Sequence, residues 1–255
     1  MTDWDLNRAA LRRHLETDKL EDFLRWSTVE KTMFVGDVGF VRKEFEELMS
    51  GYDPTDIITL GKYNAIAETP IGNPKPMYGW TSGNLIHQFY HLKQWLDRSK
   101  VNVSQLSVGL SNLSAICEVG AGYGAMALII YRLGFIGRYY IIDLPEPAQI
   151  QQYYLSRTLP NDWSNIFWLN TLPSSNLSCD LFIGCHSLSE MPVGERERLL
   201  STVETDAYLF ASSYEFEGDN QTWFREFAES TPGYKWEQWA HPHQENAFYL
   251  VGSRV

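Results

Sequence analysis

A run of seven residues, Glu118-Val-Gly-Ala-Gly-Tyr-Gly124, combines one carboxylate with three glycines at the end of a short apolar segment. Glycine is needed where the chain turns sharply and a ligand must approach backbone amides that a side chain would block. Asp143 follows Gly124 by 19 residues and ends the next apolar segment, where a carboxylate can accept the ribose hydroxyls of an adenosine-containing ligand. The residues that we predict to bind this ligand are Glu118, Gly120, Ala121, Gly122, Tyr123, Gly124, Asp143 and Leu144.

Two other interpretations fit the same residues. A tight strand-to-helix turn followed by an N-capping aspartate would produce the pattern without a ligand. The glycines with Ala125 also satisfy the looser dinucleotide fingerprint of nicotinamide enzymes. Glu118 argues against a dinucleotide, because a carboxylate near the bound ligand repels a pyrophosphate but suits a cationic amino-acid group.

The second part of the chain alternates short apolar runs with helical segments, which is typical of a parallel sheet with crossover helices. Strands are predicted at 115–119, 138–143, 165–169, 180–185 and 207–211, and helices at 123–133, 146–158, 195–203 and 221–230. Residues 236–240 and 247–252 have no helix between them, so we predict an antiparallel hairpin at the sheet edge, unlike the second half of a dinucleotide-binding domain. The predicted fold class is α/β, a Rossmann-like doubly wound, mostly parallel sheet with a C-terminal antiparallel hairpin, preceded by an N-terminal helical region.

Residues 1–112 have a helical pattern and are predicted to form a cap that shapes the substrate pocket, whereas residues 113–255 form the cofactor-binding domain. One helix is expected from Leu6 to about Leu15, a second after Thr17 as its cap up to Leu24, a third over residues 38–49 and another over residues 82–98. Residues 52–80 carry several prolines and glycines and are predicted to be a long loop with a short helix at 56–63. Loops of this length in a compact chain are often functional.

Composition excludes several partners. The formal net charge of -11 repels a polyanion, and no basic stripe compensates for it, so we predict no binding to nucleic acid. The first residues lack a signal-peptide pattern, and no apolar stretch is long enough to span a bilayer, so we expect a soluble, cytoplasmic protein without a membrane partner. Cys117, Cys179 and Cys185 lie in or beside predicted strands and are expected to be reduced core thiols. The sequence does not indicate an oligomeric state.

Three motifs resemble a known family. The strand end from Glu118 to Gly124, Asp143-Leu-Pro145 and the terminal hairpin are similar to class I S-adenosylmethionine-dependent methyltransferases. More narrowly, three motifs resemble the sugar O-methyltransferases of bacterial polysaccharide and glycoside pathways: the segment from Glu118 to Ala125, Tyr139-Tyr-Ile-Ile-Asp-Leu-Pro-Glu-Pro147 and Ser187-Leu-Ser-Glu-Met191. The resemblance covers residues 113–255 and implies S-adenosylmethionine as cofactor and methyl transfer to a hydroxyl of a sugar or a glycosylated small molecule. His186 departs from that family, which usually has asparagine before the serine.

Methyl transfer to a hydroxyl requires a group that takes up the hydroxyl proton. Open α/β sheets bind ligands at the carboxyl ends of their strands, and the fourth predicted strand delivers His186, Ser189 and Glu190 to that edge. His186 is our first candidate for the general base, because histidine accepts a proton near neutral pH, and Glu190 is the second. A polar loop that caps the next helix is the alternative interpretation.

Acceptor binding is predicted at Ser189 and at three aromatic residues of the long loop, Tyr63, Tyr78 and Trp80, which could stack on a sugar ring. His87 and His91 stand four residues apart on a predicted helix, a spacing that can bind a metal, but no carboxylate lies in a recognisable ligand motif beside them. His241 and His243, with Glu245, fall in the predicted hairpin turn, which we expect to be solvated. We therefore predict no metal site.

Two other functions remain open from the sequence. An NAD(P)-dependent oxidoreductase would use the alternative fingerprint. A non-catalytic chain that binds S-adenosylmethionine and serves as a partner subunit would need no general base.

Overall fold

The computed structural model describes residues 3–50, 61, 63–99, 110–171, 173, 176–215 and 218–255. The chain forms two compact units, each built from separate segments. The first, which we call the helical unit, comprises Met1–Tyr90, Ala121–Phe135 and Asp143–Ser164. The second, the sheet unit, comprises His91–Gly120, Ile136–Ile142 and Asn165–Val255. These units cut across the predicted division at residue 112, which stays a prediction.

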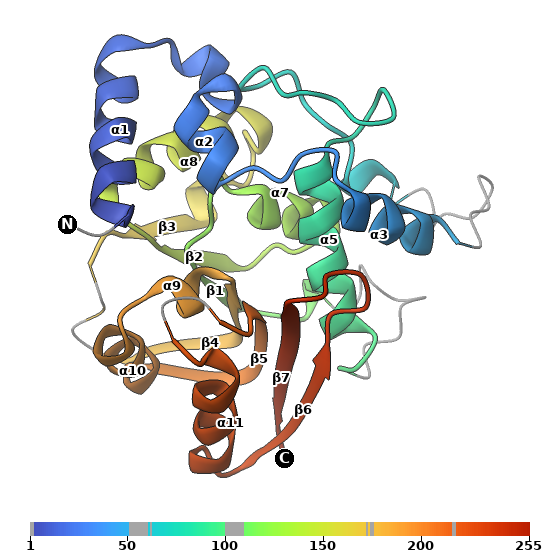
Figure 1. The fold of residues 1–255 in the computed structure, drawn as a ribbon, viewed down its shortest axis with the longest axis vertical. Coiled ribbons are helices and arrows are strands. Elements are labelled where there is room, and N and C mark those ends of the chain that lie inside the picture. The colour runs from blue at the N-terminus through green and yellow to red at the C-terminus, as the bar shows by residue number, and fades with distance from the viewer. Residues whose placement is uncertain are drawn as a thin grey trace. The chain divides into compact units, whose positions relative to one another are not determined.

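The sheet unit contains a seven-stranded sheet in the order β3-β2-β1-β4-β5-β7-β6 (Figure 1). Its strands are β1 (Ala115–Val119), β2 (Arg138–Ile142), β3 (Ile166–Leu169), β4 (Leu177–Cys185), β5 (Val203–Ser213), β6 (Tyr234–Ala240) and β7 (Ala247–Arg254). The first five strands pair in parallel, and β7 pairs antiparallel with both β5 and β6. Because β6 therefore runs in the direction of β5, both strands end at the same edge of the sheet.

The core of this unit is aromatic and aliphatic on the face that α11 (Asn220–Ser230) covers. Phe224 is fully buried, with its ring centroid 5.4 Å from that of Phe210 on β5 and 5.7 Å from that of Phe248 on β7. The unit also contains the short α9 (Ser187–Glu190) and α10 (Val193–Ser201), and Figure 1 shows α10 and α11 beside β4 and β5. Central strands buried on both faces explain the near-continuous apolar runs in the sequence.

The helical unit consists mainly of helices, and its fully buried Phe23 has ring contacts with Tyr153 and Tyr154. Its elements are α1 (Asp3–Thr17), the 3-10 helix η1 (Leu20–Arg25), α2 (Ser27–Thr32), α3 (Gly39–Met49), α7 (Ala125–Arg132) and α8 (Pro145–Thr158). Helix α5 (Gly83–Leu96) begins in this unit and ends in the sheet unit, and η3 (Trp163–Asn165) precedes β3. Arg8 and Arg12 of α1 donate hydrogen bonds to the buried carboxylate of Glu146 on α8. Burial raises the pKa of this carboxyl group, but the two guanidinium groups outweigh it and lower the pKa overall.

The predicted α/β fold, its parallel strands and its C-terminal hairpin are confirmed. Strand β4 begins at Leu177, three residues before the predicted start, because residues 177–179 continue the parallel pairing with the first residues of β5. An oxygen of Asp180 accepts the backbone N–H of Ala115 at 2.8 Å, which fixes the start of β1. Apolar periodicity alone could not show this use of a carboxylate.

Two predictions lie partly or wholly outside the described residues. Of the predicted helix at 56–63, only residues 61 and 63 are described. Of the predicted loop at 52–80, residue 61 and residues 63–80 are described. Among the described helices, none is both long and apolar enough to cross a membrane.

Candidate functional site

The ends of β1 and β2 are joined in the sheet unit where the glycine-rich turn begins. Gly120 donates its N–H to the carbonyl of Ile142 at 2.9 Å, directly beyond the last paired residues of the two strands. Glu118 is only 3% exposed and accepts a hydrogen bond from the Tyr139 hydroxyl at 2.7 Å. Its carboxylate is therefore held in place by the neighbouring strand, two residues before the turn.

Gly120 is required by a close approach within the sheet unit. It has φ of 66°, and a Cβ atom there would lie 2.3 Å from the Cβ of Ser187. The Ser187 hydroxyl donates a hydrogen bond to the carbonyl of Val119, which holds α9 against the end of β1. The first glycine of the motif thus allows a sharp turn and tight packing at the same position.

The rest of the turn belongs to the helical unit. Gly122 and Gly124 have φ of 57° and 100°, and a Cβ on Gly124 would lie 2.9 Å from a methyl carbon of Leu155. Tyr123 is fully buried, with its ring centroid 5.8 Å from that of Phe23 and 5.0 Å from that of Tyr154. Its side chain therefore anchors the turn in the core, and only its backbone is left to face a ligand.

Asp143, directly after β2, is held by α8 and by the turn. One carboxylate oxygen accepts the N–H of Leu144 at 2.7 Å, and the other accepts the amide of Gln151 at 2.7 Å. The same Gln151 amide also donates to the carbonyl of Gly122 at 3.0 Å, so it ties the turn to the aspartate. Burial raises the pKa of Asp143 to about 6, although hydrogen bonds from Leu144, Gln151 and Ala121 oppose the rise.

Sequence reasoning missed Gln151. It lies eight residues after Asp143 and is fully buried on a helix whose neighbouring buried positions are mostly apolar. A buried glutamine needs hydrogen-bond partners, so its place on the apolar face of the predicted helix was a usable signal.

His186 stands at the carboxyl end of β4 in a backbone conformation that few side chains adopt. Its φ is 64°, and its N–H donates to the carbonyl of Ala211 on β5 at 2.6 Å. Positive φ in a residue other than glycine costs free energy and is concentrated at functional sites. The side chain is half-buried.

Two more histidines and a tyrosine lie near His186 in the sheet unit. The ring of His91 is 5.6 Å from that of His186 and 6.1 Å from that of His241, measured between centroids. The Nδ1 atom of His91 is 2.8 Å from the hydroxyl of Tyr249, whose ring stacks on His241 at 5.0 Å. We call His91, His186, His241 and Tyr249 the histidine cluster. The sequence interpretation placed His241 in a solvated turn, but it is only 5% exposed.

The other predicted catalytic and substrate residues after β4 lie in α9. Ser189 is buried, and its hydroxyl donates to the carbonyl of His186, whereas Glu190 is half-buried. The buried guanidinium of Arg196 donates to the carbonyl of Ser189 at 3.2 Å. These hydrogen bonds hold the short helix in place. A role of Ser189 in acceptor binding stays a prediction.

The three predicted aromatic residues of the long loop lie in the helical unit and stack in pairs. Tyr63 and Trp80 have ring centroids 3.5 Å apart, and Tyr78 stacks on Phe45 of α3 at 4.2 Å. Tyr78 is half exposed and has φ of 53°. Their role in acceptor binding stays a prediction.

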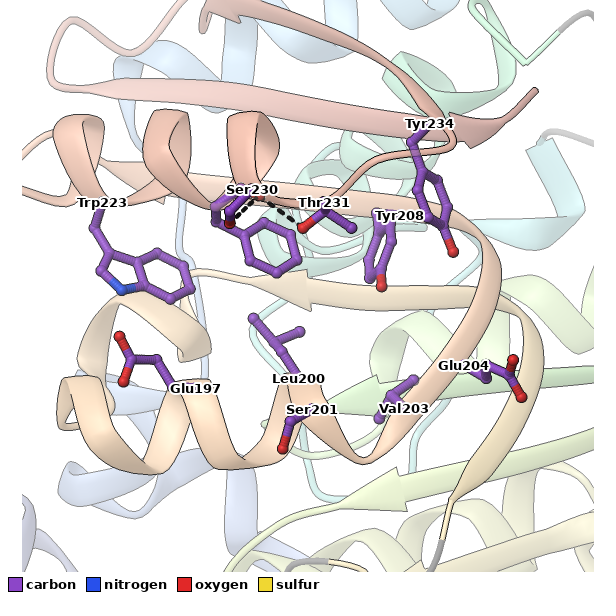
Figure 2. Close-up of a pocket in the computed structure, with 11 residues that line it drawn as sticks. Glu197, Leu200, Ser201, Val203, Glu204, Tyr208, Trp223, Ser230, Thr231 and Tyr234 are labelled. Atoms are coloured by element: carbon purple, nitrogen blue, oxygen red, sulfur yellow. Dashed lines mark hydrogen bonds between the residues drawn. The ribbon is translucent and has the colours of Figure 1, made fainter.

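The sheet unit has a hollow of about 380 Å³. Tyr208, Trp223 and Tyr234 are among the residues that line it (Figure 2). It includes Val203 at the start of β5 and Tyr234 at the start of β6. It therefore lies at the amino ends of these strands, whereas His186 and Gly120 follow carboxyl ends. Because ligands of open α/β sheets bind at the carboxyl ends, we do not assign the reaction to this hollow.

Comparison with known proteins relates the chain to solved structures. No model of a known protein family matches the sequence, and no curated protein matches it. The magnesium protoporphyrin IX methyltransferase of Synechocystis PCC 6803, solved with bound S-adenosylmethionine, is 13% identical to this chain. That similarity covers 98% of this chain and 97% of the other, with a TM-score of 0.51. An O-methyltransferase family protein from Burkholderia thailandensis is 11% identical over 68% of this chain and 60% of its own, with a TM-score of 0.46.

The first of these similarities shows the class of fold. Over nearly its whole length the chain has the fold of a class I methyltransferase, with the mostly parallel sheet and antiparallel C-terminal strands described above. The second similarity is weaker and adds nothing to this conclusion.

Proposed function

We propose that the chain is an S-adenosylmethionine-dependent O-methyltransferase that acts on a hydroxyl of a sugar or a glycosylated small molecule. The observation that carries the proposal is the pairing of the glycine-rich turn with Asp143. Gln151 bonds both the turn at Gly122 and the carboxylate of Asp143. This arrangement suits the ribose of an adenosine next to a backbone turn.

The sheet supports S-adenosylmethionine over a nicotinamide dinucleotide. A dinucleotide-binding sheet has a second mononucleotide-binding half made of parallel strands. Here the strands beyond β5 are the antiparallel β7 and β6. The similar Synechocystis protein is itself a methyltransferase solved with S-adenosylmethionine, although the likeness extends to the fold alone.

The residues present fit this cofactor. A carboxylate offers about four acceptor positions. The bonds from Leu144, Gln151 and Ala121 leave Asp143 able to accept a ribose hydroxyl, and rotation of Gln151 would open a position for the second. Glu118, buried and oriented by Tyr139, would attract the ammonium group of the methionine part, because charges interact more strongly where water is excluded.

When bound, S-adenosylmethionine would supply an electrophilic methyl group on a positively charged sulfur. Transfer would form a bond between the acceptor oxygen and the methyl carbon and break the carbon–sulfur bond, so the hydroxyl proton would have to leave. His186 and Glu190 are the residues that we propose as general bases that accept this proton, with His186 as the first candidate. Positioning of the acceptor supplies much of the remaining rate enhancement.

Isothermal titration calorimetry with S-adenosylmethionine and its demethylated product tests the proposal. We expect both ligands to bind the wild-type chain at one site, with NAD giving no heat of binding. Asp143→Ala should abolish binding, whereas Asp206→Ala, which removes an exposed aspartate at the amino end of β5, should leave it unchanged. Saturable binding of NAD without binding of S-adenosylmethionine would establish the oxidoreductase instead.

A further inference from the structure

The histidine cluster brings side chains from three distant parts of the chain to one edge of the sheet. His91 comes from α5, His186 follows β4, and His241 follows β6. His91 and Tyr249, which are 158 residues apart in sequence, are both fully buried. Histidines buried together at the edge where such sheets bind ligands need a physical explanation beyond packing.

His91 is oriented in the way that metal-binding histidines are oriented. Its Nδ1 atom is hydrogen-bonded to the Tyr249 hydroxyl at 2.8 Å, which orients the ring so that Nε2 is the nitrogen that would coordinate an ion. Histidines that ligate metals nearly always use their second ring nitrogen for such an outer hydrogen bond.

The distance between His91 and His186 suits a shared ion. One imidazole nitrogen of each lies within 4.8 Å of the other, and the ring centroids are 5.6 Å apart. With metal–nitrogen bonds of about 2.0–2.1 Å and tetrahedral angles, two imidazoles on one zinc ion have centroids roughly 5 Å apart. A small rotation of the half-buried His186 ring would bring the two ring centroids to the separation expected for a shared zinc ion.

His241 has a different role in the cluster. Its Nδ1 atom accepts the backbone N–H groups of His243 and Gln244, both at 3.1 Å. The neutral ring therefore carries its proton on Nε2 and acts as a hydrogen-bond donor. We therefore do not assign His241 as a ligand of the ion. Its Nε2–H group can instead donate a hydrogen bond to an oxygen bound to the ion.

We infer that His91 and His186 bind a divalent transition-metal ion at the carboxyl edge of the sheet. Imidazole ligands favour zinc, cobalt, nickel or copper over magnesium or calcium. The partial exposure of His186 leaves room for water or an acceptor hydroxyl in the remaining coordination positions.

The ion gives His186 a specific part in the reaction, a consequence that rests on the proposed function. A hydroxyl bound to a divalent ion loses its proton far more readily than a free one. The proton passes to solvent water, the oxygen forms its bond to the methyl carbon, and the electron pair of the broken bond stays on sulfur. His186 would then act as a ligand, since one nitrogen cannot hold the ion and accept the proton at the same time.

Calorimetric titration of the metal-free, untagged full chain with zinc chloride tests the inference, with cobalt absorption spectra as a second readout. We expect one bound ion per chain and a visible cobalt spectrum typical of four ligands. His91→Asn and His186→Asn should each weaken zinc binding by at least tenfold. Asparagine at position 91 can keep the bond to Tyr249, and asparagine tolerates the positive φ at position 186.

His14→Asn is the matched control, since His14 lies on α1, is hydrogen-bonded to Asp18 and should not affect the ion. Circular dichroism and thermal unfolding confirm that each variant is folded. Absence of zinc and cobalt binding to the folded wild type, or unchanged binding in both cluster variants, would overturn the inference. Because S-adenosylmethionine binding is measured separately, its presence without metal binding would leave the proposed function standing and return His186 to the role of general base.

Discussion

The glycine-rich turn and the histidine cluster are built on opposite principles. The turn is shaped by backbone: Gly120 and Gly124 have positive φ, and a Cβ at either position would collide with a neighbour. The cluster is made of side chains that lie on a helix or strand or directly after one, and among its four residues only His186 has positive φ. We therefore expect substitutions in the turn to change stability and substitutions in the cluster to change chemistry.

His186→Asn should have the largest effect on turnover. Loss of the imidazole impairs removal of the acceptor proton, so kcat should fall by about 10²–10⁴-fold. The affinity for S-adenosylmethionine should stay within twofold of the wild-type value. Steady-state kinetics and calorimetry measure the two quantities, with Glu190→Gln as the comparison. If Glu190→Gln lowers kcat more than His186→Asn does, Glu190 is the group that accepts the proton.

Gly120→Ala should have the next largest effect, on stability. The new Cβ would lie 2.3 Å from that of Ser187, in a left-handed conformation, so we expect a loss of about 2–4 kcal/mol in the free energy of unfolding. Urea denaturation gives this quantity. Gly194→Ala is the control, because Gly194 has open space around it near the start of α10 and should be neutral or stabilising. Equal effects would mean that the turn is not the rigid region that we describe.

Tyr249→Phe should have an intermediate effect that is confined to the cluster. The substitution keeps the ring that stacks on His241 and removes the hydrogen bond to His91. Zinc affinity should fall by about 10–100-fold, as for other outer-shell partners of metal ligands. Cofactor affinity should not change, and calorimetry with both ligands distinguishes this outcome from general damage to the sheet.

The pH dependence of cofactor binding should show the smallest effect. The pKa of Asp143 is raised to about 6, so the ionised form predominates only above that pH. Below it, the protonated carboxyl group loses acceptor capacity, and affinity for S-adenosylmethionine should fall by about tenfold per pH unit. The same raised pKa makes the unliganded fold less stable as pH rises from about 4 to 6, because the folded state holds the proton more tightly. Constant affinity between pH 5 and 7 would show that Asp143 does not bind the cofactor.

The same contrast explains what the sequence could predict. The turn, Asp143 and most strands follow from local patterns, because each depends on residues within a short βαβ segment. The histidine cluster joins α5 to β7 across 158 residues, and the predicted absence of a metal relied on the lack of a nearby carboxylate motif. The outer partner of His91 is instead Tyr249, and the carboxylate bonded to His87 is Glu44, 43 residues away on α3. No local pattern contains such contacts.

A crystal structure with the demethylated cofactor tests the central claim most directly. We predict the ribose hydroxyls within hydrogen-bond distance of Asp143, the Gln151 amide rotated away from one carboxylate oxygen, and the amino-acid end at Glu118. Density for the ligand elsewhere, or crystals of the folded chain that bind no ligand at saturating concentration, would contradict the assignment of this turn to S-adenosylmethionine.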